Sequence, residues 1–350
     1  MATSKRARWI SNPLILTLPI IFLFTLSSCN SVPALTNPVE EGISISTPAA
    51  TQTIAPLLTQ TIAISSSTES ATQRPEIVPT STPTEILTIE KENQFIPLFG
   101  FPIAPPGSNL IETSYRFGST QSGDRIPHDG VEMVNPEGTQ VVAVSDGLVY
   151  FSGDDRSIQR GRFLDFYGDL IILEHHFENY SKPIYTLYAH LSQIIVKEGE
   201  SVSKGQEIGL VGASGAAFTN HLHFEVRVGN PFLENARNPE LFLPLNPPEK
   251  QSEVGILIGS LRDQVGDLLP GVSVVIQNVQ NGELILDNPI YVESYAQSIS
   301  GDENWNENFV VSNLQVGNYR VSAYANQYLL EEFITIKPNE YSIVNLEPDE

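Results

Sequence analysis

Six histidines provide most of the chemistry available to this chain, and all of them lie between residues 128 and 223. They occur in four short stretches, PHDGVE, LEHHFE, LYAHLS and NHLHFEV, which contain His128, His175, His176, His190, His221 and His223. Imidazole is a common metal ligand and exchanges protons near neutral pH. This clustering predicts a metal-binding or proton-transferring site in that segment.

The stretch NHLHFEVRV has the apolar content of a β-strand. Side chains alternate between the two faces of a strand, so His221 and His223 point one way while Leu222 and Phe224 point the other. A core is not usually built with two histidines on one face. The pattern therefore favours chemistry over packing, and the alternative is a solvated strand face.

A catalytic zinc ion needs three protein ligands, drawn from histidine and carboxylate, and one open position for water. Glu132 follows His128 by four residues, across a turn at Asp129-Gly130. His128, Glu132 and His223 can therefore supply a set of two histidines and a carboxylate. His221 and His190 are then free to handle protons.

Three of these stretches resemble the signatures of the lysostaphin-type, or LytM-like, zinc endopeptidases of peptidoglycan. HDGVE, LYAHLS and NHLHFEV are similar to the family patterns HxGxD, YxHL and HLHFE, and the resemblance covers about residues 115–230. It implies a mainly β fold, with a small open β-sheet core of the duplicated hybrid motif type and a zinc groove. It also implies Zn²⁺ as cofactor and peptidoglycan peptide stems or cross-bridges as substrate.

The resemblance implies roles for individual residues. His128, Glu132 and His223 match the zinc ligands, and His221 matches the histidine that acts as general base. His190 matches a second active-site histidine, which stabilises the oxyanion or passes protons on. His175 and His176 match no ligand, so we expect them to have structural roles.

One position departs from the family pattern, because Glu132 stands where the family has aspartate. The extra carbon–carbon bond adds up to about 1.5 Å of reach, whereas a functional constellation tolerates roughly 0.5 Å of misplacement. The backbone or the rotamer must absorb the difference. The alternative is therefore a degenerate relative, which binds wall peptides or activates another hydrolase without cutting.

The N-terminus has the features of an export signal. Lys5, Arg6 and Arg8 precede the apolar run PLILTLPIIFLFTL, and LSSC then ends at Cys29, the only cysteine of the chain. The run is short for a membrane span. The pattern resembles a bacterial lipobox, which implies a signal peptide over 1–29 and a lipid on Cys29 that anchors the chain to the outer face of the cell membrane. The alternative is an ordinary signal peptide.

Composition divides the rest of the chain into three regions. Residues 30–93 are rich in Ser, Thr and Pro and predict a disordered tether. Residues 94–250 contain short apolar runs between Gly, Asp and Asn turns, which predict a β domain. The net charge of −22 and the lack of a Lys/Arg stripe beyond the N-terminus argue against a nucleic-acid partner.

Residues 251–350 contain evenly spaced alternating strands, which predict a second domain with a β-sandwich fold. The region resembles, more loosely, the carboxypeptidase-regulatory-like (transthyretin-like) sandwich, through GSLRDQVGDLLPGVSVVIQN and NLQVGNYRVSAYANQY. That resemblance implies a spacing or wall-attachment module, and its loss is expected to spare the hydrolysis of soluble peptides. The sequence sets no oligomeric state.

Overall fold

The computed structural model describes residues 93–245 and 248–348. The predicted signal peptide, Cys29 and the tether up to residue 92 lie outside the described residues, so export and lipidation stay predictions. No helix in the described part of the chain is both long enough and apolar enough to cross a membrane.

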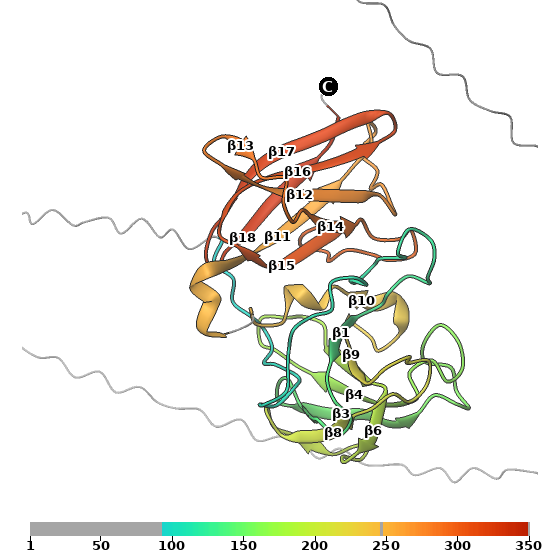
Figure 1. Cartoon of the computed structure of the whole chain (residues 1–350). Helices are drawn as coiled ribbons and strands as arrows, with labels where there is room; N and C mark the ends of the chain where they lie inside the picture. Colours follow the sequence, from blue (N-terminus) through green and yellow to red (C-terminus); the bar gives the residue numbers. More distant parts are fainter. Residues whose placement is uncertain (1–92, 246–247, 349–350) are drawn as a thin grey trace, which may run out of the picture. The chain divides into compact units, whose positions relative to one another are not determined.

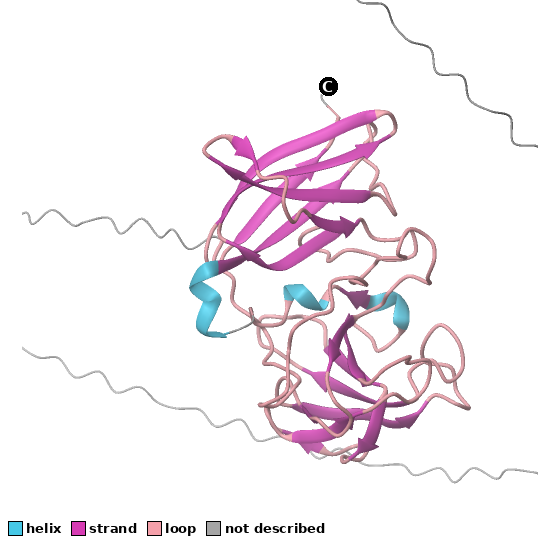
Figure 2. Cartoon of the chain, viewed as in Figure 1, coloured by secondary structure: helices cyan, strands magenta, loops and turns pink. Residues whose placement is uncertain are grey.

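Strands and loops make up nearly all of the described chain, as Figure 2 shows. The helical elements are three short 3₁₀ turns, η1 (Leu233–Asn235), η2 (Pro239–Leu241) and η3 (Pro248–Glu253). The prediction of a mainly β protein is confirmed.

The N-terminal half of the described chain contains a seven-stranded sheet and a three-stranded sheet (Figure 1). The larger sheet has the order β1-β9-β5-β4-β3-β7, with β10 also paired to β9. Its strands are β1 (Val131–Val134), β3 (Gly147–Asp154), β4 (Asp169–His175), β5 (Ile184–Ala189), β7 (Ser201–Val202), β9 (His221–Val228) and β10 (Ala236–Arg237). The smaller sheet has the order β2-β8-β6 and consists of β2 (Gln140–Val142), β8 (Glu207–Val211) and β6 (Leu191–Ile194).

Strand β9 is buried on both faces, and each face has its own composition. Leu222, Phe224 and Val226 are fully buried in the main hydrophobic cluster. The alternate residues His221, His223, Glu225 and Arg227 are also buried, but on the opposite face. The apolar face fixes the strand in the core, and the pleat then delivers a row of polar side chains to the other side of the sheet.

The C-terminal half consists of a three-stranded sheet, β15-β11-β18, and a five-stranded sheet, β13-β12-β16-β17 with β14 paired to β12. Their strands are β11 (Val254–Leu261), β12 (Ser273–Gln280), β13 (Glu283–Leu284), β14 (Ile290–Glu293), β15 (Phe309–Gln315), β16 (Gly317–Ala325), β17 (Tyr328–Ile336) and β18 (Tyr341–Leu346). One buried cluster draws side chains from both sheets, as expected of a sandwich. The likeness to the carboxypeptidase-regulatory-like domain stays a prediction.

The two halves share buried structure. The main hydrophobic cluster includes Val254, Ile256 and Ile258 of β11 together with residues of the N-terminal sheets. Arg116 also forms a buried ion pair at 2.8 Å with Glu240, whose carboxylate accepts hydrogen bonds from the backbone N–H and the hydroxyl of Ser312 on β15. The hydrogen bonds from Ser312 offset part of the desolvation of the Glu240 carboxylate at this depth.

Candidate metal centre

Strand register brings the candidate ligands together. Glu132 of β1 lies directly opposite His223 of β9, and Ala189 of β5 lies opposite His223 on the other side. Directly opposite residues present their side chains on the same face of a sheet. His190 directly follows Ala189, the last residue of β5, so His190, His223 and Glu132 come from β5, β9 and β1, which are neighbours in the sheet.

The distances within the cluster suit a tetrahedral ion. His128 Nε2 lies 3.3 Å from His223 Nδ1 and 3.5 Å from Glu132 Oε1. The three ligand atoms all lie within 4.8 Å of one another. Ligands about 2.0–2.1 Å from a tetrahedral zinc ion are separated by roughly 3.3–3.4 Å. The longer side chain of Glu132 thus keeps its carboxylate in the cluster.

Hydrogen bonds on the outer side of each imidazole fix its tautomer. His128 donates from Nδ1 to the Tyr115 carbonyl at 2.7 Å, and His223 donates from Nε2 to Glu225 at 3.0 Å. His190 and His221 both donate from Nδ1, at 2.8 Å, to the carbonyls of Ser214 and Thr219. A neutral imidazole carries one N–H, so the remaining nitrogen of each ring holds a lone pair.

Two of these lone pairs face each other, an arrangement that suits the binding of a cation. His128 Nε2 and His223 Nδ1 are 3.3 Å apart, yet neither has a proton to donate. Among residues 93–245 and 248–348, the Nε2 atom of His221 finds no hydrogen-bond partner; it is buried and lies 3.6 Å from Glu132 Oε1. Buried polar atoms are normally satisfied. A divalent cation between the two ligand nitrogens and the carboxylate would complete the site, so the donor set fits zinc.

Burial favours the neutral form of three of these imidazoles, those of His128, His190 and His221. The pKa of His128 is held well below its usual value by burial and by the neighbouring His223. Burial, followed by His223 and His221, lowers the pKa of His190 to about 3. Burial also lowers the pKa of His221, although the Glu132 carboxylate opposes it. Neutral rings are the form that binds a metal or accepts a proton.

A buried network supports His223 from behind. The Glu225 carboxylate accepts hydrogen bonds from His223 Nε2, from the Tyr167 hydroxyl and from Arg227 Nε. Burial raises the pKa of Glu225, but Arg227 and the His223 hydrogen bond outweigh it and lower the pKa to about 2. An ionised carboxylate behind a ligand histidine orients the ring and increases its basicity.

His190 is positioned by an unusual backbone conformation. Its φ angle is 61°, in the left-handed region that non-glycine residues rarely occupy, and its N–H donates to the Tyr167 carbonyl at 3.0 Å. Its ring centroid lies 4.8 Å from that of His221 and 5.6 Å from that of His223. Such conformations persist where the surrounding structure over-determines them, often at functional sites.

The remaining two histidines lie outside the cluster. His175 is buried and bonds through Nδ1 to the Asp146 carbonyl and through Nε2 to the Thr186 hydroxyl. His176 is exposed and pairs with Glu174 at 2.8 Å. Neither ring lines the groove that contains the metal cluster.

Several residues of the site were not singled out from the sequence. Glu225 and Arg227 could have been found, because the two-residue period of β9 places them on the face of His221 and His223. Asp129 forms a buried ion pair with Arg162 at 2.6 Å. Burial and Glu225 raise the pKa of Asp129 to about 6, against the effect of Arg162. No local sequence pattern predicts the Asp129–Arg162 pair, because the two residues lie on separate loops.

The cluster lies in a groove of about 650 Å³. Its walls are partly aromatic, and Phe218 is 90% exposed at the rim. The guanidinium of Arg125 stacks 4.9 Å from the centroid of the Tyr115 ring and 5.9 Å from that of Phe218. The groove therefore offers flat apolar contacts and one cation beside the candidate metal site.

Residues 126–238 match the model of Peptidase family M23. Among curated relatives, the chain is 33% identical to the peptidoglycan DD-endopeptidase ShyA of Vibrio cholerae, over 36% of this chain and 26% of that protein. It is 31% identical to the murein hydrolase activator NlpD of Escherichia coli, over 40% of this chain and 30% of that protein. The chain thus spans less than a third of the length of either relative.

The solved structures with similarity include the catalytic domain of the antimicrobial peptidase lysostaphin from Staphylococcus simulans. The sequence identity is 30%, and the match covers 37% of this chain and 89% of that chain with a TM-score of 0.31. The matched family segment contains all six histidines and Glu132.

Proposed function

We propose that the protein is a zinc-dependent endopeptidase that hydrolyses peptide bonds in bacterial peptidoglycan. The observation that carries the proposal is the convergence of ligand atoms from His128, His223 and Glu132, which all lie within 4.8 Å of one another, beside the two further neutral imidazoles of His190 and His221. The match to a peptidase family and the peptidoglycan endopeptidases among the relatives support the substrate class.

His128, His223 and Glu132 would hold the zinc ion. Bound zinc supplies a water molecule of lowered pKa and a polarised scissile carbonyl. His221 then acts as general base, because its Nε2 is unprotonated and unpaired on the side of Glu132. The hydrogen bond from its Nδ1 to Thr219 keeps that tautomer and holds the ring in place.

His190 would act second. Its Nδ1–H is engaged with the Ser214 carbonyl, so Nε2 accepts a proton before it can donate one. Nε2 would take the second proton of the attacking water, and the resulting imidazolium would stabilise the oxyanion or protonate the leaving amine. His190 must therefore accept a proton before it donates one, because its only N–H is already engaged with Ser214.

The groove supports a peptide substrate. Exposed aromatic side chains at 163 and 218 provide surfaces for an extended chain, and Arg125 provides a cation for a substrate carboxylate. The carboxylates of Glu112 and Asp124 also line the groove, so a substrate carboxylate would have to lie on the Arg125 side.

The second candidate function is a degenerate domain that binds wall peptides or activates another hydrolase without cleaving. Two observations favour it. Glu132 replaces the aspartate of the family pattern, and the relatives include murein hydrolase activators. In either case the proposed location is the cell envelope, with the chain exported and held to the outer face of the membrane by a lipid on Cys29.

One experiment tests the function and separates the two candidates. Zinc content and digestion of purified peptidoglycan are measured for the full chain and for His221→Ala, with His176→Ala as a control on an exposed histidine. The endopeptidase should bind one zinc, and His221→Ala should keep it while turnover falls about 10²–10⁴-fold. Loss of zinc in this variant would contradict the role given to His221.

The variant Glu132→Asp distinguishes a cutting from a non-cutting protein. If wild type digests peptidoglycan, Glu132 supports catalysis as it stands. If digestion appears only in Glu132→Asp, the native chain is a binder or activator and the proposal of an endopeptidase is wrong.

A further inference from the structure

The metal ligand His128 stands at the end of a loop that has no strand of its own. We call residues 113–128 the ligand loop; it also forms one wall of the groove. The main chain of His128 is tied back onto this loop. Its N–H donates to the Ser119 carbonyl at 3.1 Å, and its carbonyl accepts from Gly118 N–H at 2.8 Å. The position of His128 therefore depends on residues 118 and 119.

Residues 119–122 are held by a carboxylate of the C-terminal sandwich. Glu293, at the end of β14, accepts hydrogen bonds from the Ser119 hydroxyl at 2.7 Å and from the Thr120 hydroxyl and N–H at 2.8 and 2.9 Å. It also accepts from Ser122 N–H at 3.3 Å. One side chain thus satisfies four donors of a loop that is about 170 positions away in sequence.

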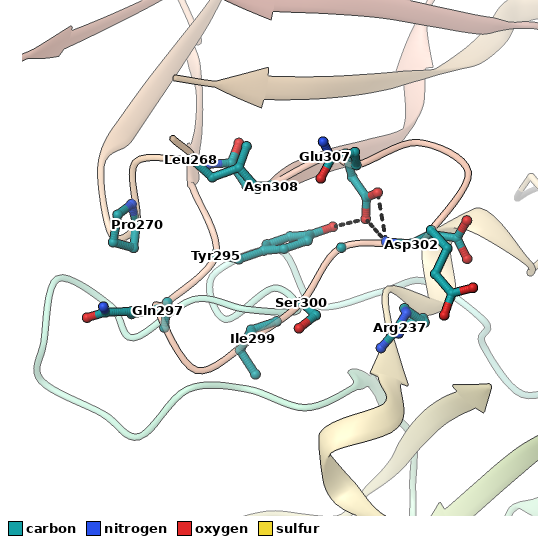
Figure 3. A pocket seen from close by; sticks show the side chains of 14 residues that line it. Arg237, Leu268, Pro270, Tyr295, Gln297, Ile299, Ser300, Asp302, Glu307 and Asn308 are labelled. Atoms are coloured by element: carbon teal, nitrogen blue, oxygen red, sulfur yellow. Dashed lines mark hydrogen bonds between the residues drawn. The ribbon is translucent and has the colours of Figure 1, made fainter. Parts of the chain in front are cut away.

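The backbone just before these residues is held by Tyr295. Its ring packs edge-on against Phe117 at 5.1 Å, and its neighbour Ala296 donates from N–H to the Gly118 carbonyl at 2.8 Å. The Tyr295 hydroxyl points to Glu307 and donates to it at 3.2 Å, as Figure 3 shows. Asn238 donates in turn to that hydroxyl at 2.9 Å. The tyrosine is therefore fixed at both ends.

Gly118 leaves room for this contact. Its φ angle is +79°, and a Cβ at this position would lie 2.4 Å from Tyr295 Cδ1. Main chain and aromatic ring meet without an intervening side chain. Arg116, two residues earlier, is held by the buried Glu240 that also binds Ser312. Residues 118, 119, 120 and 122 thus contact the C-terminal sandwich directly. Arg116 contacts it through Glu240, which also binds Ser312 of the sandwich.

We propose that Glu293 is a positioning residue for the metal ligand His128, so that the C-terminal sandwich forms part of the structural support of the metal centre. This inference rests on the proposed function only in taking the His128 cluster as a zinc site. A module that only spaced the peptidase from its anchor would leave the ligand loop untouched. Here the sandwich supplies the acceptors that fix the loop.

The test measures zinc affinity of the full chain by competition with a chelator, without any need for hydrolysis. Glu293→Ala removes the acceptor from the sandwich side, and the pair Ser119→Ala/Thr120→Val removes the hydroxyl donors from the loop side. Loss of a supporting group typically costs about 10–100-fold in metal affinity, and we expect about tenfold for either change. Glu331→Ala is the matched control, since that carboxylate of β17 pairs with the Arg320 guanidinium at 3.3 Å and is remote in sequence from the ligand loop.

A double-mutant cycle distinguishes positioning from general stability. If Glu293 acts through the loop, the triple variant loses no more zinc affinity than Glu293→Ala alone, because that change already removes the acceptor of the two hydroxyls that the loop-side pair deletes. Additive losses, or unchanged zinc affinity in a folded Glu293→Ala, would overturn the inference. If Glu293→Ala does not fold, the zinc affinity of Ser119→Ala/Thr120→Val tests the proposal by itself. Wild-type zinc affinity in that variant would count against the proposal.

The outcomes also separate this inference from the proposed function. Wild-type protein that binds zinc without digesting peptidoglycan removes the endopeptidase proposal alone. Wild-type protein that digests peptidoglycan while both sets of variants keep full zinc affinity removes the positioning role alone.

Discussion

Replacing Glu225 by glutamine tests how the proton on His223 is set. The Glu225 carboxylate accepts hydrogen bonds from three donors, namely His223 Nε2–H, the Tyr167 hydroxyl and Arg227 Nε–H. Glutamine offers one oxygen and one NH₂ group in the same space. If the oxygen serves Arg227, the NH₂ group faces His223 and forces its proton onto Nδ1, where the metal must bind. If the oxygen serves His223, the NH₂ group opposes a buried guanidinium.

The expected magnitude follows from the loss of one supporting charge. A group behind a ligand histidine contributes about 10–100-fold to metal affinity, which corresponds to about 1.4–2.7 kcal/mol. We expect Glu225→Gln to weaken zinc binding by this amount. The buried Arg227 also loses its counter-charge, so the apo protein should unfold at a lower temperature.

The assay is a chelator competition at pH 7.5 on the folded full chain, with the thermal midpoint of the apo protein measured in parallel. Glu174→Gln is the matched control, because it alters a second Glu–His pair, at 2.8 Å, in which the histidine is exposed and remote from the ligand set. Zinc affinity of Glu225→Gln within threefold of wild type, in a folded protein, would refute the tautomer mechanism.

Two further predictions concern stability. Burial raises the pKa of Glu307 to about 7, above its value in the unfolded chain, so the folded state holds the proton more tightly. Glu307 should therefore contribute up to about 3 kcal/mol to the free energy of unfolding of the apo protein below pH 4.5, and this contribution should be lost as pH rises to 8. Glu307→Gln should lack this fall and be the more stable protein at pH 8, as measured by urea unfolding; a parallel pH dependence in both proteins would contradict it. Gly118→Ala should lower the thermal midpoint more than Gly123→Ala, since both have positive φ but only position 118 meets Tyr295, and equal losses would show that the tyrosine contact is unimportant.

The fold class and the candidate ligands could be predicted from the sequence because both depend on local patterns. The alternation of β9 fixed which side chains share a face, and His221 and His223 indeed lie with Glu225 and Arg227 on one side. The short apolar runs between turns identified strands such as β8 and β9. Glu225 could have been recognised by the same alternation.

Long-range contacts could not be predicted in this way. The register that sets Glu132 opposite His223 joins strands far apart in the chain, and it decides whether a longer carboxylate reaches the cluster. The Glu293 contacts with the ligand loop cross from one half of the chain to the other, and no motif marks them. They argue against the expectation that loss of residues 251–350 would spare the hydrolysis of soluble peptides, since that truncation removes Glu293 and Tyr295.

Three of the four imidazoles in the groove, His128, His190 and His221, donate their outer N–H to main-chain carbonyls. Peptide oxygens are present whatever residue occupies positions 115, 214 and 219, so mutation there leaves the acceptor in place. Of the four, only His223 donates to a side-chain acceptor, the carboxylate of Glu225. The tautomers of these three rings are thus insensitive to substitution of the residues that accept their hydrogen bonds. The tautomer of His223 is the one that a single substitution, at Glu225, can change.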